Sequence, residues 1–130
     1  ANKGTFVMTE ERETQKWAWP KRVVFTVPID EKAVHDFDYD VAREDQLLQV
    51  RFDGDDVIWI LRSGLVPMMN EELNANIDSW EDENIADLLA IQAIVPRLRA
   101  RWPASEIVMK IADLCAEAVR LGTCLDVDIA

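Results

Sequence analysis

The segment HDFDYDV, residues 35–41, places carboxylates at every second position, at Asp36, Asp38 and Asp40. Successive side chains of a β-strand point to opposite faces, so this spacing would set the three aspartates in one row on the solvent face. Such a row repels itself by about 0.6 kcal/mol per neighbouring pair in water. It would attract cations or a basic partner, or else protect an exposed sheet edge against pairing with other chains.

The apolar residues between these aspartates are expected to face the core. If the segment is a strand, burial of these apolar residues fixes which face of the strand packs on the core, while the carboxylates stay in solvent. The three residues expected to be buried are Phe37, Tyr39 and Val41.

Acidic side chains are concentrated in two segments of the chain. Residues 30–56 hold ten acidic and three basic residues, and residues 71–96 hold seven acidic and no basic residues, within a chain of net charge −11. In the second segment, DSWEDEN is expected to surround the start of a helix, where the helix dipole by itself favours negative charge. The functional alternative is that both segments bind a basic protein partner. Beyond the three aspartates above, these candidates are Glu44, Asp45, Asp53, Asp55, Asp56, Glu81, Asp82 and Glu83.

Sequence motifs for metal, nucleotide or nucleophilic chemistry are missing. An EF-hand that starts at Asp36 would need glycine and glutamate where Val41 and Leu47 stand, and the single histidine, His35, has no serine or cysteine close to it in sequence. The two cysteines form no C-x-x-C pair, and the four glycines are too dispersed for a phosphate-binding loop. We therefore expect no metal and no cofactor. A hydrolase that uses paired carboxylates remains an alternative.

Aromatic residues give a secondary candidate for an interface. Trp17 and Trp19 alternate with Ala18 before Pro20, and therefore share one face of a strand that ends at the proline. Aromatic side chains are enriched at binding hot spots, although core packing is the alternative for this pair.

The elements that must position these residues change type halfway along the chain. Strands are expected for GTFVMT, RVVFTVPI, HDFDYDV, LLQVRF and DVIWIL, with the last two joined in a hairpin at Asp53-Gly54-Asp55. Helical spacing follows in NEELNANI, then in a helix capped by Ser79, and then in a helix from Ser105 to Leu121 that stops at Gly122. The segment CLDVDI alternates again and is a candidate for a last strand.

This order predicts one α+β domain over residues 1–130. Its sheet is expected to be an antiparallel β-meander of four to five strands in the N-terminal half, covered on one face by two main C-terminal helices. The start, ANKGTFVM, lacks the basic and apolar regions of a signal peptide, and the longest uncharged apolar run has nine residues, so a cytoplasmic protein is expected.

The net charge favours a basic protein partner and disfavours direct binding to nucleic acid or membranes. The leading hypothesis is a non-enzymatic inhibitor that occupies the basic nucleic-acid-binding surface of a nuclease or a defence-system component. It would act like an immunity protein or a phage anti-defence protein that mimics nucleic acid. The alternatives are an accessory or chaperone-like oligomeric subunit and a small carboxylate-dependent enzyme. A homodimer is compatible with each of these.

Overall fold

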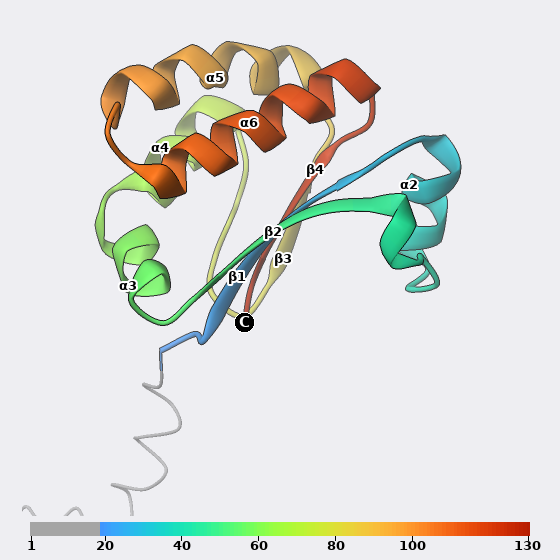
Figure 1. Cartoon of the computed structure of the whole chain (residues 1–130), viewed down its shortest axis with the longest axis horizontal. Helices are drawn as coiled ribbons and strands as arrows, with labels where there is room; N and C mark the ends of the chain where they lie inside the picture. The colour runs from blue at the N-terminus through green and yellow to red at the C-terminus, as the bar shows by residue number, and fades with distance from the viewer. Residues whose placement is uncertain (1–18) are drawn as a thin grey trace, which may run out of the picture.

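One antiparallel sheet of four strands organises the protein, in the order β2-β1-β4-β3 (Figure 1). The computed structural model describes residues 19–130. The strands are β1 Arg22–Pro28, β2 Leu47–Asp53, β3 Asp82–Ile85 and β4 Leu125–Ile129. The helices are α2 Glu31–Asp38, the 3-10 helix η1 Glu44–Gln46, α3 Asp55–Arg62, α4 Leu65–Leu73, α5 Leu88–Arg101 and α6 Glu106–Leu121.

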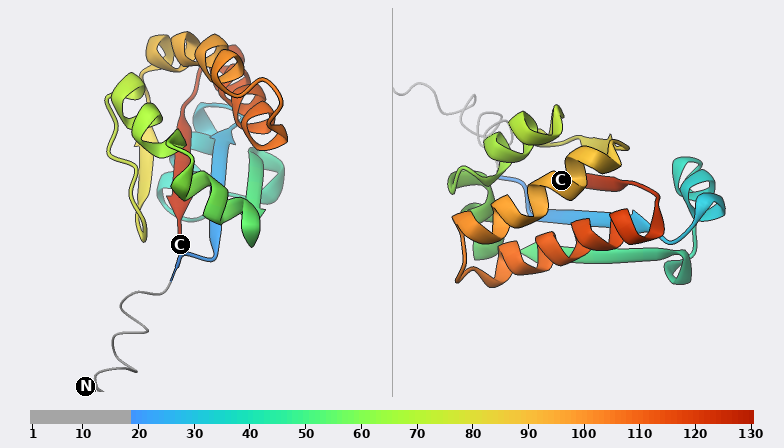
Figure 2. Two further views of the ribbon diagram at one scale, coloured as in Figure 1. Left: turned by 90° about the vertical axis from the view of Figure 1, so that its left-hand side faces the viewer. Right: turned by 90° about the horizontal axis from the view of Figure 1, so that it is seen from above.

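Helices cover one face of this sheet. Figure 1 shows α4, α5 and α6 on the same side of the strands, and Figure 2 shows α5 and α6 lying across them from above. The sheet meets this layer through alternate residues of its two central strands, which are at most 1% exposed: Val23, Phe25, Val27, Leu125, Val127 and Ile129. Buried residues of α5 and α6, including Ile94, Leu98, Ile111 and Cys115, complete the same core.

The predicted α+β class is confirmed, with a strand number inside the expected range. The strand at residues 22–28, the strand that starts at Leu47 and the return of CLDVDI to the sheet are all present. The helix over residues 106–121 has the expected ends, because Ser105 caps it and Gly122 closes it with a φ of 70°. Two of the four strands, β3 and β4, come from the second half of the chain. The predicted strand GTFVMT lies outside the described residues.

The predicted strand at residues 35–41 is wrong, because most of this segment belongs to helix α2. The Asp30 side chain accepts a hydrogen bond from the backbone N–H of Ala33 at 2.8 Å and thereby caps the helix. Ala33, Val34 and Phe37 then occupy helical spacing toward the protein. Tyr39 and Val41, which the strand interpretation would bury, are 69% and 64% exposed.

The predicted hairpin at Asp53-Gly54-Asp55 is also wrong. Gly54 has the positive φ that the pattern requires, at 58°, but it precedes helix α3 rather than a second strand. Two acidic residues in the first turn, Asp55 and Asp56, favour a helix start, and Val57 and Ile60 bury its inner side. The short apolar run DVIWIL fits a strand or a buried helix equally well by its periodicity.

The acidic segment DSWEDEN does not start a helix, contrary to prediction. It leads into strand β3, and the following helix α5 begins after Asp87, whose carboxylate accepts a hydrogen bond from the Ala90 N–H at 3.1 Å. The short helix expected in NEELNANI exists, but it begins earlier, at Leu65, and ends at Leu73. Asn74 follows in the left-handed conformation, which ends the helix.

Gly54→Ala tests the backbone at the junction of β2 and α3. A Cβ atom at this position would meet nothing within 4 Å, so the whole cost comes from the backbone angles, φ 58° and ψ −130°. We expect the free energy of unfolding to fall by about 1–3 kcal/mol in urea denaturation. Equal stability of variant and wild type would show that the backbone does not hold these angles.

Candidate binding surface on the open sheet face

The face of the sheet opposite the helix layer carries polar side chains. The register pairs Asp128 of β4 with Asp82 of β3, and Asp126 of β4 with Asn84. On the other side of β4, Asp126 lies opposite Thr26 of β1, whose hydroxyl accepts a hydrogen bond from the Gln49 amide of β2 at 2.9 Å. Alternation therefore gathers three aspartates from two neighbouring strands on one surface.

A hollow of about 510 Å³ lies on this surface. Carboxylates from β3, β4 and the turn after α2 border it, and two arginines from β1 and β2 lie among the same lining residues. Its main polar and aromatic lining residues are Arg22, Thr26, Phe37, Asp40, Gln49, Arg51, Asp82, Asp126 and Asp128. The hollow thus brings together Asp40 from the first acidic segment and Asp82 from the second.

Asp126 is the most perturbed acid of this surface. The residue is only 3% exposed, and burial together with the charge of Asp82 raises the pKa of its carboxyl to about 7. The nearby Asn84 amide opposes this shift by stabilising the charged form, while Asp128 adds a further repulsion. The hollow therefore has among its lining residues one carboxyl whose pKa lies near neutral pH.

The chemistry available at this surface is that of carboxylates. Among residues 19–130, no three His, Cys, Asp or Glu side chains are arranged to hold a metal ion. Both cysteines, Cys115 and Cys124, are buried and unlinked, and burial raises the pKa of the Cys115 thiol to about 12, which keeps it protonated. The hollow therefore offers ion pairing to ammonium or guanidinium groups, and proton transfer through Asp126.

The side chain of Asp36, the first aspartate of the predicted row, holds two elements of the fold together. Its carboxylate accepts hydrogen bonds from the Lys32 ammonium at 2.6 Å and from the Gln46 amide at 2.8 Å. The bond from Gln46, followed by that from Lys32, holds the pKa of Asp36 well below its usual range. Gln46 is buried and also accepts a hydrogen bond from the Arg43 N–H, so Asp36 fastens α2 to η1.

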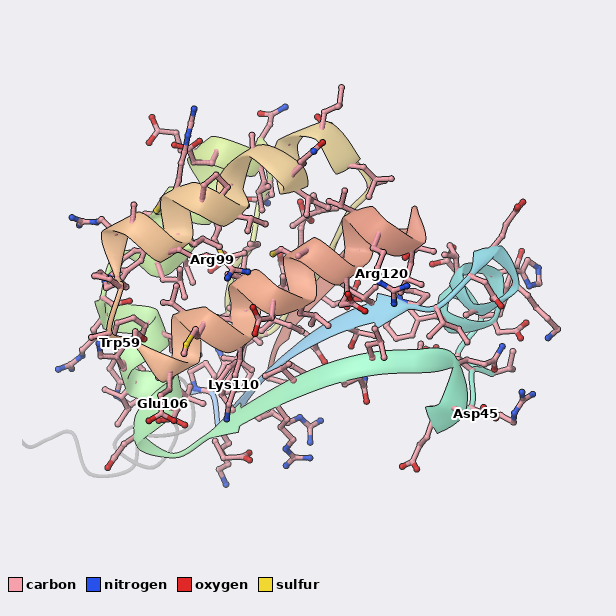
Figure 3. The ribbon with its side chains drawn as sticks, turned by 45° about the horizontal axis from the view of Figure 1, so that its top comes forward. Asp45, Trp59, Arg99, Glu106, Lys110 and Arg120 are labelled. Carbon is pink, nitrogen blue, oxygen red and sulfur yellow. The ribbon has the colours of Figure 1, made fainter. Side chains whose placement is uncertain are left out.

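The other predicted residues of the first segment lie at both ends of β2. Asp38, Asp40, Glu44 and Asp45 are exposed at the end where α2 and η1 lie, and Figure 3 shows Asp45 there, with Trp59 of α3 at the opposite end. Asp53, Asp55 and Asp56 are exposed at that opposite end. The seven residues of β2 separate the two groups by about 20 Å, so they do not form one patch.

In the second segment the three predicted residues face different surroundings. Asp82 borders the hollow, whereas the Glu83 carboxylate accepts a hydrogen bond from the Asn76 N–H at 2.8 Å. Glu81 is exposed, and its backbone carbonyl accepts a hydrogen bond from the Ile129 N–H at 3.1 Å.

Of the tryptophan pair, Trp17 lies outside the described residues. Trp19 is 49% exposed, and the Arg62 guanidinium lies 5.0 Å from the centre of its ring. Trp80 is the more exposed aromatic residue, at 57%, and it has a φ of 69°, which is unusual for a bulky side chain. Its backbone N–H donates to the carbonyl of Ile129, next to Asp128.

Sequence reasoning missed Asp126, Asp128 and Trp80 as site residues. The alternation in CLDVDI carried the signal for the first two, because a strand with apolar residues at every second position must place both aspartates on one opposite face. No sequence pattern indicates the positive φ of Trp80 or the exposure of its ring.

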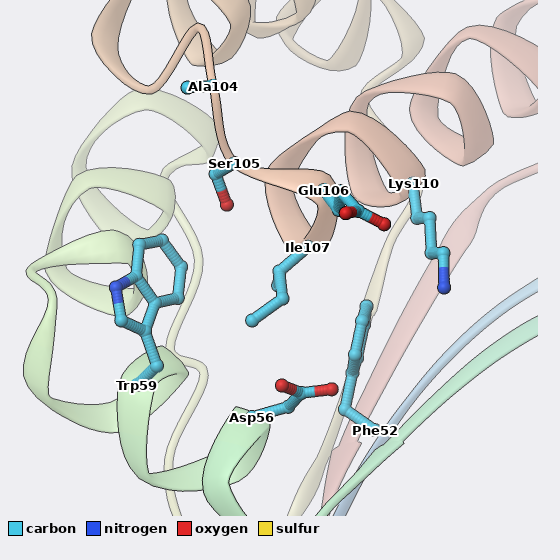
Figure 4. Close-up of a pocket in the computed structure, with 8 residues that line it drawn as sticks. All are labelled: Phe52, Asp56, Trp59, Ala104, Ser105, Glu106, Ile107 and Lys110. Atoms are coloured by element: carbon cyan, nitrogen blue, oxygen red, sulfur yellow. The ribbon is translucent and has the colours of Figure 1, made fainter.

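A second hollow, of about 460 Å³, lies between α3, β2 and the start of α6 (Figure 4). Asp56 is the predicted site residue that lines it, and its carboxylate lies near Ile107 and Phe52 in that view. Glu106 and Lys110 form the α6 side. This hollow faces the edge of the sheet, and it shares no lining residue with the hollow of the open face.

Asp36→Ala should lower the urea midpoint of unfolding, because it leaves the buried Gln46 amide without this acceptor. The lowered pKa of Asp36 makes its contribution complete above the ordinary value of 3.8 and lost as the pH falls below it. The difference between variant and wild type should therefore disappear in acid. Asp38→Ala, an exposed neighbour on the same helix, is the matched control and should unfold like wild type.

Asp126→Asn should have the opposite pH dependence. A raised pKa means that the folded protein holds the proton while the unfolded chain has lost it, so Asp126 destabilises the protein increasingly as the pH rises from about 4 to about 7. The variant should gain stability over wild type across this range, measured by urea unfolding at several pH values. Asp45→Asn is the exposed control. A constant difference at all pH values would contradict the raised pKa.

Comparisons with known proteins do not indicate a function, so a function has to be inferred from the residues of this chain. No protein-family model, no curated protein and no solved structure gives a significant match to this chain. No helix among residues 19–130 has the length and the apolar character needed to cross a membrane.

Proposed function

We propose that this protein binds and inhibits a basic partner protein, and that the open sheet face is the surface it uses. The partner is an enzyme with a nucleic-acid-binding surface, such as a nuclease or a component of a defence system. In this role the protein would be an immunity protein or an anti-defence protein that takes the place of nucleic acid. The observation that carries the proposal is the convergence of Asp40, Asp82 and Asp128 on one hollow, whose lining also holds the nearly buried Asp126 and two arginines, Arg22 and Arg51.

Three features support this function over a purely solubilising role for the charge. The acidic residues of β4 are placed by a central strand, so their positions are fixed by the core on the other face. The hollow is large enough to admit long side chains such as lysine or arginine. Trp80 is exposed and stands two residues before Asp82 in the chain, outside the lining of the hollow, and tryptophan is enriched at binding hot spots.

A carboxylate-dependent enzyme is the second candidate, and Asp126 is the observation that favours it. A carboxyl with a pKa of about 7, next to the carboxyl group of Asp82, resembles an acid–base pair. Such an enzyme would lose its activity on substitution of Asp126, whereas an inhibitor that acts by surface charge would retain binding through Asp82 and Asp128.

The experiment begins with purification of the tagged protein from its own organism and identification of the bound protein by mass spectrometry. A basic nucleic-acid enzyme is the expected partner. The double variant Asp82→Asn/Asp128→Asn should then slow association with that partner and reduce its salt dependence, because charge steers the encounter. Glu31→Gln/Glu71→Gln is the control with equal charge change at exposed positions outside the hollow. Equal effects of the two double variants would show that net charge alone acts, and would reject this surface.

A further inference from the structure

Strand β2 forms an edge of the sheet. It pairs through seven residues with β1 on one side, and no other strand of residues 19–130 pairs with its second side. Backbone N–H and C=O groups on the free side of an edge strand can pair with an added extended chain.

A groove runs between this free edge and helix α6. One hollow of about 460 Å³ lies along it, and its lining includes Leu48, Val50 and Leu114, with Lys110, Asp113 and Glu117 of α6 on the border. The hollow of Figure 4 continues it toward Phe52, and Lys110 belongs to the lining of both. Figure 3 shows Lys110 on α6 directed toward β2. The groove therefore follows most of the length of the strand.

In the middle of this groove the two acidic side chains of α6 are each paired with an arginine, and Lys110 lies among the same lining residues. The Asp113 carboxylate forms an ion pair with Arg99 of α5 at 3.0 Å, and Glu117 pairs with Arg120 at 2.7 Å. Val50, at the centre of β2, is half-buried and packs against the core. An added strand would meet apolar side chains in this middle part.

Both ends of the groove are acidic. Glu44 and Asp45 precede the strand, Asp53 is its last residue, and Asp55 and Asp56 follow it. Arg43 lies 3.1 Å from Asp45 and Arg51 lies 3.3 Å from Asp53, but these pairs are exposed and leave an excess of negative charge at each end.

This arrangement of charge disfavours a second copy of the chain as the occupant. An antiparallel pair of β2 strands would bring Glu44 and Asp45 of one copy toward Asp55 and Asp56 of the other, at both ends of the joint. The same carboxylates would attract an extended segment that carries basic residues at its two ends.

We infer that the free edge of β2 accepts an extended segment of the partner protein, with apolar side chains at alternate positions and basic residues at both ends. The inference rests on the proposed binding of a basic partner and adds a second contact, on the edge rather than the open face. Backbone pairing with β2 would supply affinity, the apolar groove would receive every second side chain, and the acidic ends would fix the position of the segment.

A synthetic peptide of alternating valine and threonine, with pairs of lysines at both ends, is the probe. Its binding is measured by fluorescence anisotropy, and its place on the protein by hydrogen exchange of the β2 amides. We expect the lysine peptide to bind and to protect the β2 amides that point away from β1. A peptide with glutamates in place of the lysines is the matched control and should bind at least about tenfold more weakly.

Two sets of variants separate the edge from the open face. Replacing Glu44, Asp45, Asp55 and Asp56 by their amides should weaken the lysine peptide about tenfold, while Asp82→Asn/Asp128→Asn should leave its affinity unchanged. Circular dichroism and thermal unfolding confirm that each variant is folded.

Several results would overturn the inference. Binding that depends on Asp82 and Asp128 without protection of β2 would place the peptide on the open face, and the proposed function would survive. Equal binding of the lysine and glutamate peptides would remove the charge argument. Concentration-dependent protection of β2 without peptide would identify a second copy as the occupant. If Asp82→Asn/Asp128→Asn abolishes binding of the natural partner and the β2 amides stay unprotected in the complex, the proposed function is supported and the contact at the β2 edge is rejected.

Discussion

The two-residue alternation of the central strands is the constraint on which the rest of the structure depends. In β4, Leu125, Val127 and Ile129 are buried under the helices, so Asp126 and Asp128 must point to the other face. Burial of the first set stabilises the sheet, and the same burial holds the carboxylates of the second set in fixed positions. The positions of Asp126 and Asp128 are therefore a direct result of how the core is packed, whereas Asp40 reaches the same hollow from the turn after α2.

How far the sequence predicts this structure differs between its elements. The class, β1, the start of β2, β4 and the limits of α6 follow from patterns that are strong over their full length. Helices α2 and α3 were mistaken for strands because each has only eight residues, which is too short for periodicity to decide. In α2, aspartates at every second position imitate a strand, and the capping by Asp30 outweighs that pattern.

The candidate site was less predictable than the fold, because it depends on contacts between distant segments. Sequence reasoning identified the acidic composition and named Asp40 and Asp82, but it did not place them at one hollow. It also treated Asp36 as free, whereas Gln46 and Lys32 occupy its carboxylate. Both outcomes follow from the register of β3 on β4 and from the packing of α2 on η1, and neither is encoded in local residue spacing.

The pairing of β1 with β4 also governs how the chain must fold. Val23 lies opposite Ile129, about a hundred residues away in sequence, whereas β1 with β2 and α5 with α6 are contacts between near neighbours. Closing so long a loop carries an entropy cost that local contacts avoid. Topologies of this kind fold slowly, because the central pairing can form only after the ends of the loop meet. The β1–β2 and α5–α6 pairs join segments that are close in sequence, whereas β4 reaches its place between β1 and β3 only by closing a loop of about a hundred residues.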